Sequence, residues 1–251
     1  MVASNVALDR SSAAGGRRVI AQSMTMHDVA ISPTPAENLR YEFSPDLVTL
    51  SGQRPEETEA IRTARTHLIA RHIHDGRRGL AMCAATKGVG CTFTSTNLAV
   101  SLAQVGVATL LIDGDLREPS LEQFIKPPSP AQGLKQCLEA NAGPYTGYMH
   151  PEVIPNLSLL YAGGVSENAQ EALASAAFRT LVERCLRDFE FTIIDTPAAS
   201  QCADGIRIST IIGYTLIVAR ANTSRFAELG TLAGQLREDG AQIVGTILNE
   251  T

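Results

Sequence analysis

The chain has 251 residues, 44% of them hydrophobic, which is enough for one large α/β domain and a tail. Its formal net charge of -5 and the lack of a clustered basic run argue against nucleic-acid binding. The cysteines are odd in number and form no C-x-x-C pair, so neither a zinc site nor a disulfide framework is indicated. No apolar run approaches the roughly 18 residues that span a bilayer, and no signal peptide is visible. We therefore expect a soluble, cytoplasmic protein that reaches a membrane only through a partner.

Residues 1–45 form the first distinct segment of the chain. They are rich in Ser, Ala, Gly and Pro and lack a periodic apolar pattern, so we predict a mostly disordered tail. A short partner-binding segment around Val19-Ile20 is an alternative to a plain linker, which is favoured. Residues 46–251 are expected to fold as one domain.

Near-continuous apolar strands alternate with helical patterns along this domain. The predicted strands are 79–84, 108–112, 157–161, 191–194, 214–219 and 243–248. The predicted helices are 55–69, 92–105, 121–125, 133–140, 175–188, 204–211 and 225–239, and the segment 141–155 is expected to be irregular. Apolar strands of this kind are buried on both faces. The sequence therefore predicts an α/β fold, doubly wound, with a mainly parallel sheet and helices on both faces.

The helix that begins at Pro55 carries a charged stripe. Glu59, Arg62 and Arg65 recur every three residues and so lie along one helix face. From the spacing alone, a solvated stripe of ion pairs is the leading interpretation.

The first predicted strand leads into a glycine-bearing turn and a helix, which is the layout of a phosphate-binding loop. Against the template G-x-x-x-x-G-K-[ST], Gly90 and Thr92 fit, Ala85 replaces the first glycine, and Cys91 stands where the lysine belongs. Backbone N–H groups of such a loop and the following helix surround phosphates. The expected nucleotide-binding residues are Gly88, Val89, Gly90, Cys91, Thr92 and Phe93.

Carboxylates follow two further apolar strands. Asp113 and Asp115 end the second strand, and Asp195 ends another. In an open parallel sheet these strand ends meet at the ligand-binding edge. Magnesium prefers hard oxygen ligands and keeps several waters, so we expect Thr92, Asp113 and Asp195 at the metal. Asp113, with Asp115 beside it, is also the candidate for activating a hydroxyl.

Several of these motifs resemble bacterial tyrosine kinases that govern capsule and exopolysaccharide synthesis. Residues 107–121, with Asp113-Gly-Asp115-Leu-Arg117, resemble the family's Walker A′ motif, and residues 191–197 resemble its Walker B motif. The stripe Glu59-x-x-Arg62-x-x-Arg65 is similar to the family's E-x-x-R-x-x-R subunit-contact helix. The resemblance covers about residues 46–251, and it makes an inter-subunit contact the leading interpretation of that stripe.

The resemblance implies a P-loop, MinD-like ATPase domain that binds ATP or ADP with Mg²⁺. It also implies a ring of subunits and a membrane-spanning polysaccharide co-polymerase as activator. Arg117 is expected to pair with the acids or with phosphate, because a guanidinium matches either. Asn249 resembles the asparagine that reads adenine in related ATPases, and an ordinary strand-ending asparagine is an equal alternative.

Two departures bear on catalysis. Cys91 is a neutral thiol in place of the loop lysine, and the tyrosine cluster expected near the C-terminus is not seen, so we expect no autophosphorylation on such a tail. Lys87 is a candidate catalytic substitute that reaches the phosphates from the same loop. A reactive Cys91 thiol is a further alternative, since helix N-termini lower thiol pKa values.

The leading hypothesis is a kinase-like subunit of exopolysaccharide synthesis that binds a nucleotide and has weak or lost kinase activity. Three alternatives stay open at this point. The first is an active kinase or ATPase that uses Lys87 and phosphorylates targets in trans. The second is a MinD/ParA-like positioning ATPase, and the third is a metabolic ligase or reductase of the same superfamily.

Overall fold

The computed structural model describes residues 40–139 and 144–250. Residues 1–39, with the segment around Val19-Ile20, lie outside the described residues. The predicted end of the tail at residue 45 is wrong for its last residues, because Glu42–Phe43 form strand β1, which pairs antiparallel with β4 (Ile125–Lys126). The Tyr41 hydroxyl also lies 2.8 Å from Nδ1 of His150. Backbone pairing and this side-chain contact therefore attach residues 41–43 to the domain.

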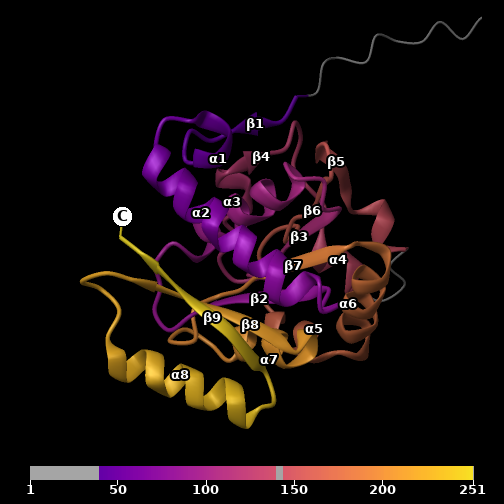
Figure 1. Cartoon of the computed structure of the whole chain (residues 1–251). Coiled ribbons are helices and arrows are strands. Elements are labelled where there is room, and N and C mark those ends of the chain that lie inside the picture. The colour runs from indigo at the N-terminus through magenta and orange to yellow at the C-terminus, as the bar shows by residue number, and fades with distance from the viewer. Residues whose placement is uncertain (1–39, 140–143, 251) are drawn as a thin grey trace, which may run out of the picture. The chain divides into compact units, whose positions relative to one another are not determined.

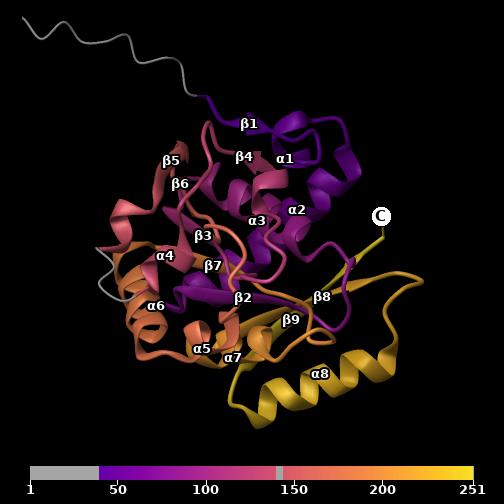
Figure 2. The same ribbon diagram turned by 180° about the vertical axis from the view of Figure 1, so that it is seen from behind.

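A seven-stranded sheet forms the centre of the domain, with strand order β5-β6-β3-β7-β2-β8-β9 (Figures 1 and 2). Its strands are β5 (His150–Ile154), β6 (Leu157–Leu160), β3 (Thr109–Asp113), β7 (Phe191–Asp195), β2 (Gly79–Ala84), β8 (Tyr214–Arg220) and β9 (Gln242–Asn249). Neighbouring strands are parallel except β5, which is antiparallel to β6. Every residue of β2, β3 and β7 is buried, as continuous apolar strands in the middle of a parallel sheet should be.

Helices cover both faces of the sheet. They are α1 (Val48–Ser51), α2 (Pro55–Leu68), α3 (Cys91–Ala103), α4 (Leu134–Cys137), α5 (Ala169–Ala174), α6 (Ala176–Asp188), α7 (Asp204–Ile212) and α8 (Phe226–Glu238). Apolar residues of α2 and α3 pack on one face, and those of α5, α6 and α7 pack on the other. Helix α8 contributes to a smaller cluster with β2 and β8. The doubly wound α/β prediction is confirmed.

Three predicted segments differ from the structure. Of the segment 141–155, which is predicted to be irregular, residues 141–143 lie outside the described residues, whereas residues 150–154 form β5, an antiparallel edge strand that contains Pro151. Proline is tolerated there because an edge strand leaves some N–H positions without a ladder partner. The predicted helices at 121–125 and 133–140 are shorter: a 3-10 turn at Leu121–Gln123 and α4 at Leu134–Cys137.

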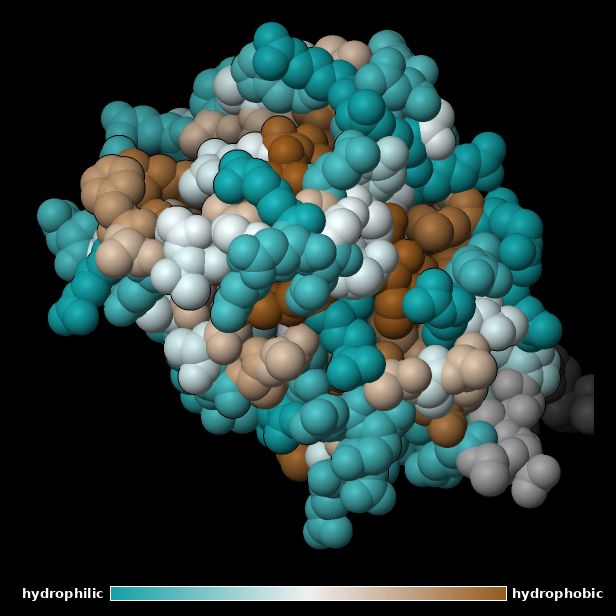
Figure 3. Space-filling view, turned by 90° about the horizontal axis from the view of Figure 1, so that it is seen from below, coloured by the Kyte–Doolittle hydropathy of each residue, from teal (hydrophilic) through white to brown (hydrophobic). Residues whose placement is uncertain are grey.

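The surface on the side of α8 mixes hydrophilic side chains with separate hydrophobic patches (Figure 3). Phe226, the first residue of α8, is 93% exposed. Within the described residues, no helix is both long and apolar enough to cross a membrane.

Candidate nucleotide site

The loop between β2 and α3 bends sharply at two glycines. Gly88 and Gly90 have φ of 77° and 87°, a region that residues with a Cβ rarely adopt. A Cβ on Gly90 would lie 2.3 Å from Nδ2 of Asn249, which comes from the end of β9. The loop then enters α3 at Cys91. The local backbone is therefore that of a tight anion-binding turn at a helix N-terminus.

This loop lines a cavity of about 420 Å³ at the carboxyl edge of the sheet. The predicted site residues on its wall are Lys87, Gly88, Val89, Gly90, Cys91, Thr92, Phe93 and Asp115. Asp113, Asp195, Arg117 and Asn249 are not among the lining residues. The structure also places Glu118, Ser120 and Gln201 on the wall, three residues that sequence reasoning missed.

Asp195 lies directly behind the loop. The Thr92 hydroxyl donates to Oδ2 of Asp195 at 2.6 Å, and Ser120 Oγ lies 2.8 Å from the same hydroxyl. Oδ1 of Asp195 is buried without a hydrogen-bond partner among the described residues. Burial raises the pKa of Asp195 to about 6, against the opposing effect of the Thr92 hydroxyl. A buried carboxylate oxygen without a hydrogen-bond partner is suited to bind a cation directly or to accept a hydrogen bond from a water that is bound to a cation.

Asp113 is the register partner of Asp195 on the neighbouring strand. Its two oxygens accept backbone N–H bonds at 3.1 Å from Asp115, Ser120 and Leu121. Burial, followed by the nearby charge of Asp195, raises the pKa of Asp113 to about 7. Asp113 thus orders the connection after β3. Because its pKa is about 7, it is partly protonated at neutral pH.

The oxygen atoms at this edge fit a magnesium ion. In the described part of the chain, no group of three or more His, Cys, Asp or Glu side chains is placed to hold a metal by itself. Magnesium does not need such a cage, since it retains waters and shares phosphate oxygens. The Thr92 hydroxyl and the unpartnered oxygen of Asp195 are the protein ligands that this geometry favours, with Asp113 behind them.

Cys91 does not imitate a lysine. Its thiol donates to the Met82 carbonyl at 3.3 Å. Burial and the charge of Asp195 raise the pKa of this thiol well above its usual value. Because a reactive cysteine needs a lowered pKa, the alternative of a reactive thiol at Cys91 is not supported. The position is occupied by a neutral thiol that is hydrogen-bonded to the backbone of β2.

The two basic residues predicted at the site, Lys87 and Arg117, are already paired. Lys87 forms an ion pair with Glu118 across the cavity. Arg117 donates from Nε to Asp204 at 2.7 Å, and the Asp204 side chain is buried at the start of α7. Arg117 therefore pairs with an acid other than Asp113, Asp115 and Asp195, and it ties the Walker A′ segment to α7.

Tyrosine kinases are among the known proteins similar to this chain. The tyrosine-protein kinase CpsD of Streptococcus agalactiae is 31% identical over 172 residues, which cover 68% of this chain and 74% of CpsD. The chain belongs to the bacterial tyrosine-protein kinase family. The putative tyrosine-protein kinase CapB of Staphylococcus aureus is 28% identical over 199 residues, 78% of this chain and 86% of CapB. The resemblance read from the motifs is thus confirmed, although no family model matches the chain.

Other members of the family are much longer. The chain matches the tyrosine-protein kinase wzc of Salmonella typhi at 30% identity, but it spans only 29% of that protein. Among solved structures, the kinase domain of the Escherichia coli tyrosine kinase ETK superposes with a TM-score of 0.74 at 27% identity, over 87% of this chain and 85% of that one. The cell division ATPase MinD of Pyrococcus furiosus shares the fold, with a TM-score of 0.59 at 23% identity, over 68% of this chain and 71% of MinD.

The three charged residues of the stripe on α2, Glu59, Arg62 and Arg65, differ in their surroundings. Glu59 and Arg62 form an exposed pair at 3.8 Å. Arg65 instead donates to Ser101 of α3, at 3.2 Å to its hydroxyl. The Glu59 and Arg62 side chains are thus exposed at the surface, whereas the Arg65 side chain is held against α3.

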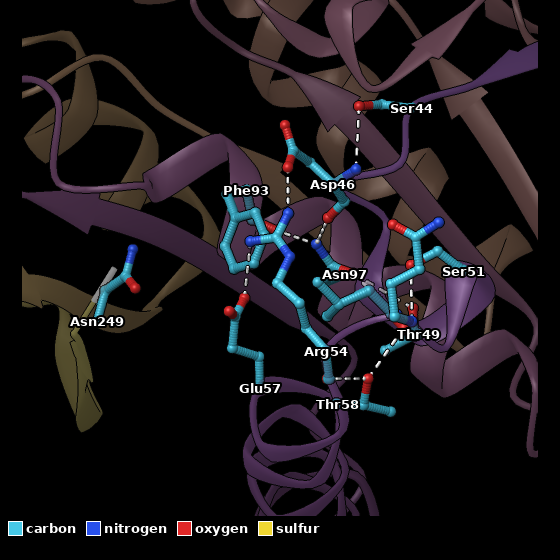
Figure 4. A network of polar contacts seen from close by, with 12 residues as sticks. Ser44, Asp46, Thr49, Ser51, Arg54, Glu57, Thr58, Phe93, Asn97 and Asn249 are labelled. Carbon is cyan, nitrogen blue, oxygen red and sulfur yellow. Dashed lines mark hydrogen bonds and ion pairs between the residues drawn. The ribbon is translucent and has the colours of Figure 1, made fainter.

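A polar network attaches the start of the described domain to α3, the helix that follows the phosphate loop (Figure 4). Arg54 pairs with Asp46 and Glu57, and its guanidinium lies 5.9 Å from the centroid of the Phe93 ring. Asn97 of α3 donates to the backbone carbonyl of Asp46 at 3.0 Å. On the other side of Phe93 in the same view, Asn249 donates to the carbonyl of Val89 at 3.1 Å. Both ends of the described domain therefore contact the phosphate loop or its helix.

Proposed function

We propose that this chain is a kinase-like regulatory subunit of capsule or exopolysaccharide synthesis that binds a magnesium nucleotide and transfers phosphate weakly or not at all. It acts in the cytoplasm, at the inner face of the membrane, on a polysaccharide co-polymerase. The observation that carries the proposal is Cys91, a neutral thiol bonded to the Met82 carbonyl where the loop lysine belongs.

Nucleotide binding is supported by what the site retains. The backbone N–H groups from Gly88 to Thr92 and the positive end of α3 attract phosphate without a side-chain charge. Bound magnesium would neutralise phosphate charge and polarise the phosphoryl group. In this proposal Thr92 and Asp195 orient such an ion, and Asp113 supports the connection that carries Ser120.

Weak transfer is supported by what the site lacks. Charge-assisted hydrogen bonds of a lysine to phosphate contribute about 1.5–3 kcal/mol each, and the loss of one preorganised donor slows chemistry ~10²–10³-fold. Asp113, the residue expected to activate a hydroxyl, is buried and does not line the cavity. Asp115 does line it, so it is the better placed base if transfer occurs.

Partners are proposed from the surface. Glu59 and Arg62, which pair weakly on the exposed face of α2, are suited to exchange partners with a second subunit in a ring. Arg65 supports their helix from below through Ser101. The co-polymerase is proposed as the activator that recruits the chain to the membrane.

Calorimetric titration of Mg-ADP and Mg-ATP into the wild type and Cys91→Lys tests the proposal. We expect measurable but weak binding by the wild type and roughly 10–100-fold tighter binding by the variant, the equivalent of one charge-assisted bond. Thr231→Lys, which adds the same charge on the exposed side of α8, should leave both affinities unchanged. No binding by either protein, or equally tight binding by both, would overturn the proposal.

A second candidate is an active kinase or ATPase that uses Lys87, because Lys87 lines the cavity. It predicts robust tyrosine phosphorylation of an added substrate from labelled ATP, and loss of that signal in Lys87→Ala. The leading proposal predicts little signal from either protein.

A further inference from the structure

We propose that Glu118 is a specificity-determining residue that sets how much phosphate charge the cavity accepts, by holding Lys87 in an ion pair across it. This inference rests on the proposed nucleotide-binding function. It gives Glu118 a role in controlling Lys87 that the motifs do not assign to it.

Three loops of the carboxyl edge meet at this pair. Lys87 lies in the loop after β2, Glu118 in the connection after β3, and Gln201 in the connection after β7. The Lys87 ammonium contacts Oε2 of Glu118, while Gln201 donates to Oε1 at 3.4 Å. All three residues line the cavity. A single carboxylate thus links the phosphate loop to both neighbouring loops.

The charges on the cavity wall make this pair decisive. Among the residues that line the cavity, all of them described, Lys87 is the single basic residue, and Asp115 and Glu118 are the acidic ones. The lining therefore has a formal charge of one cation against two anions, and its cation is already neutralised. Cys91 adds no charge. When phosphates bind in the cavity, Lys87 either stays paired with Glu118 or breaks that ion pair and binds the phosphates instead.

The pair is weak enough to be exchanged. The Lys87 and Glu118 side chains are 61% and 50% exposed, so water screens their attraction. Phosphate carries more charge than a carboxylate, so a bound nucleotide can take Lys87 away from Glu118. The Glu118 carboxylate then repels the ligand, and this repulsion is larger for a triphosphate than for a diphosphate because the triphosphate carries more negative charge. Glu118 therefore lowers the affinity for triphosphate more than the affinity for diphosphate.

Glu118 can be changed without disturbing the turn. Asp115, the other acidic residue of the lining, accepts N–H bonds from Arg117 and Glu118 at 3.0 and 2.8 Å and so shapes the backbone. In the described part of the chain, the Glu118 side chain forms hydrogen bonds or ion pairs with Lys87 and Gln201 only. Glu118→Gln keeps the shape of the side chain and removes its charge.

Calorimetry with Mg-ATP, Mg-ADP and inorganic tripolyphosphate tests the inference, using wild type, Glu118→Gln, Lys87→Gln and the double variant. We expect Glu118→Gln to bind Mg-ATP and tripolyphosphate about fivefold more tightly and Mg-ADP by a smaller factor, the scale of one exposed ion pair. Lys87→Gln should abolish most of that gain in the double variant. Glu122→Gln, an exposed glutamate in the same connection that does not line the cavity, should change nothing.

Unchanged affinities in Glu118→Gln would overturn the inference, and so would a full gain that persists without Lys87. The same series in the Cys91→Lys background separates this result from the proposed function. If Cys91→Lys binds Mg-ATP and Glu118→Gln leaves its ATP-to-ADP preference unchanged, the role of Glu118 is wrong while nucleotide binding stands. If Cys91→Lys binds no nucleotide, the proposed function itself is wrong.

Discussion

Replacing Asp195 by asparagine is expected to stabilise the nucleotide-free protein at pH 8 and to have little effect at pH 4. The asparagine side chain would keep the size of the aspartate and an oxygen that accepts from the Thr92 hydroxyl, which now donates to Asp195 at 2.6 Å. What the substitution removes is a buried negative charge next to Asp113. The variant therefore isolates the energetic cost of keeping this site ionised without a cation.

The direction follows from the raised pKa. The pKa of Asp195 rises from 3.8 to about 6 on folding, so between these values the folded state binds more protons than the unfolded state. The contribution of Asp195 to stability therefore falls as pH rises through this window and stays lost above it. About two pKa units correspond to roughly 3 kcal/mol. Loss of the Asp195 charge should also lower the pKa of Asp113, which adds to the gain.

Urea unfolding from pH 4 to pH 8 measures the effect as the difference between variant and wild type. Burial lowers the pKa values of His72 and His150, which makes stability rise with pH, but this contribution cancels in the difference. Asp239→Asn, at an exposed carboxylate, is the matched control. A stability difference for Asp195→Asn that does not grow with pH would refute the assignment of a costly buried charge. With Mg-ADP present the same variant should bind more weakly than wild type.

Two further predictions concern the loop and its helix. Gly90→Ala is expected to cost about 1–3 kcal/mol of stability and to weaken Mg-ADP binding, because Gly90 has φ of 87°. Gly234→Ala in α8, where a Cβ meets nothing within 4 Å, should instead stabilise the protein slightly. Equal effects of the two variants in urea unfolding would contradict the assignment of backbone strain to an alanine at position 90. Asn97→Ala is expected to cost about 2–3 kcal/mol of stability, because its buried amide forms hydrogen bonds with Thr49 and with neighbouring carbonyls. Gln104→Ala, which removes one hydrogen bond to Thr49, should cost clearly less in urea unfolding. A smaller loss for Asn97→Ala than for Gln104→Ala would count against the importance of the Asn97 network.

Much of the fold could be read from local patterns. The predicted strand 79–84 matches β2, and the predicted strands for β3 and β7 differ by no more than one residue at each end. Such strands are continuous apolar runs. Because they are parallel, their carboxyl ends all lie at the same edge of the sheet. That is why the phosphate loop, Asp113 and Asp195 could be expected together. Strand β5 escaped prediction because an edge strand with proline lacks that pattern.

The partners of the charged residues could not be read in this way. Lys87, Arg117 and Arg65 were expected at phosphate, acids or a subunit interface, and the structure pairs them with Glu118, Asp204 and Ser101. Long flexible side chains choose among groups brought close by distant parts of the chain, and no local spacing encodes that choice.

The phosphate loop, with Cys91 in place of its lysine, is described partly by the sequence and partly by the tertiary structure. The sequence by itself determined the parallel sheet, the phosphate loop at its carboxyl edge and the missing cation, because backbone preference and hydrophobic period are local properties. Only the tertiary structure decided that the Cys91 thiol bonds to Met82, that Asp113 and Asp195 hold raised pKa values, and that Lys87 is paired across the cavity. Burial and electrostatic pairing depend on atoms that are far apart in the chain and close in space.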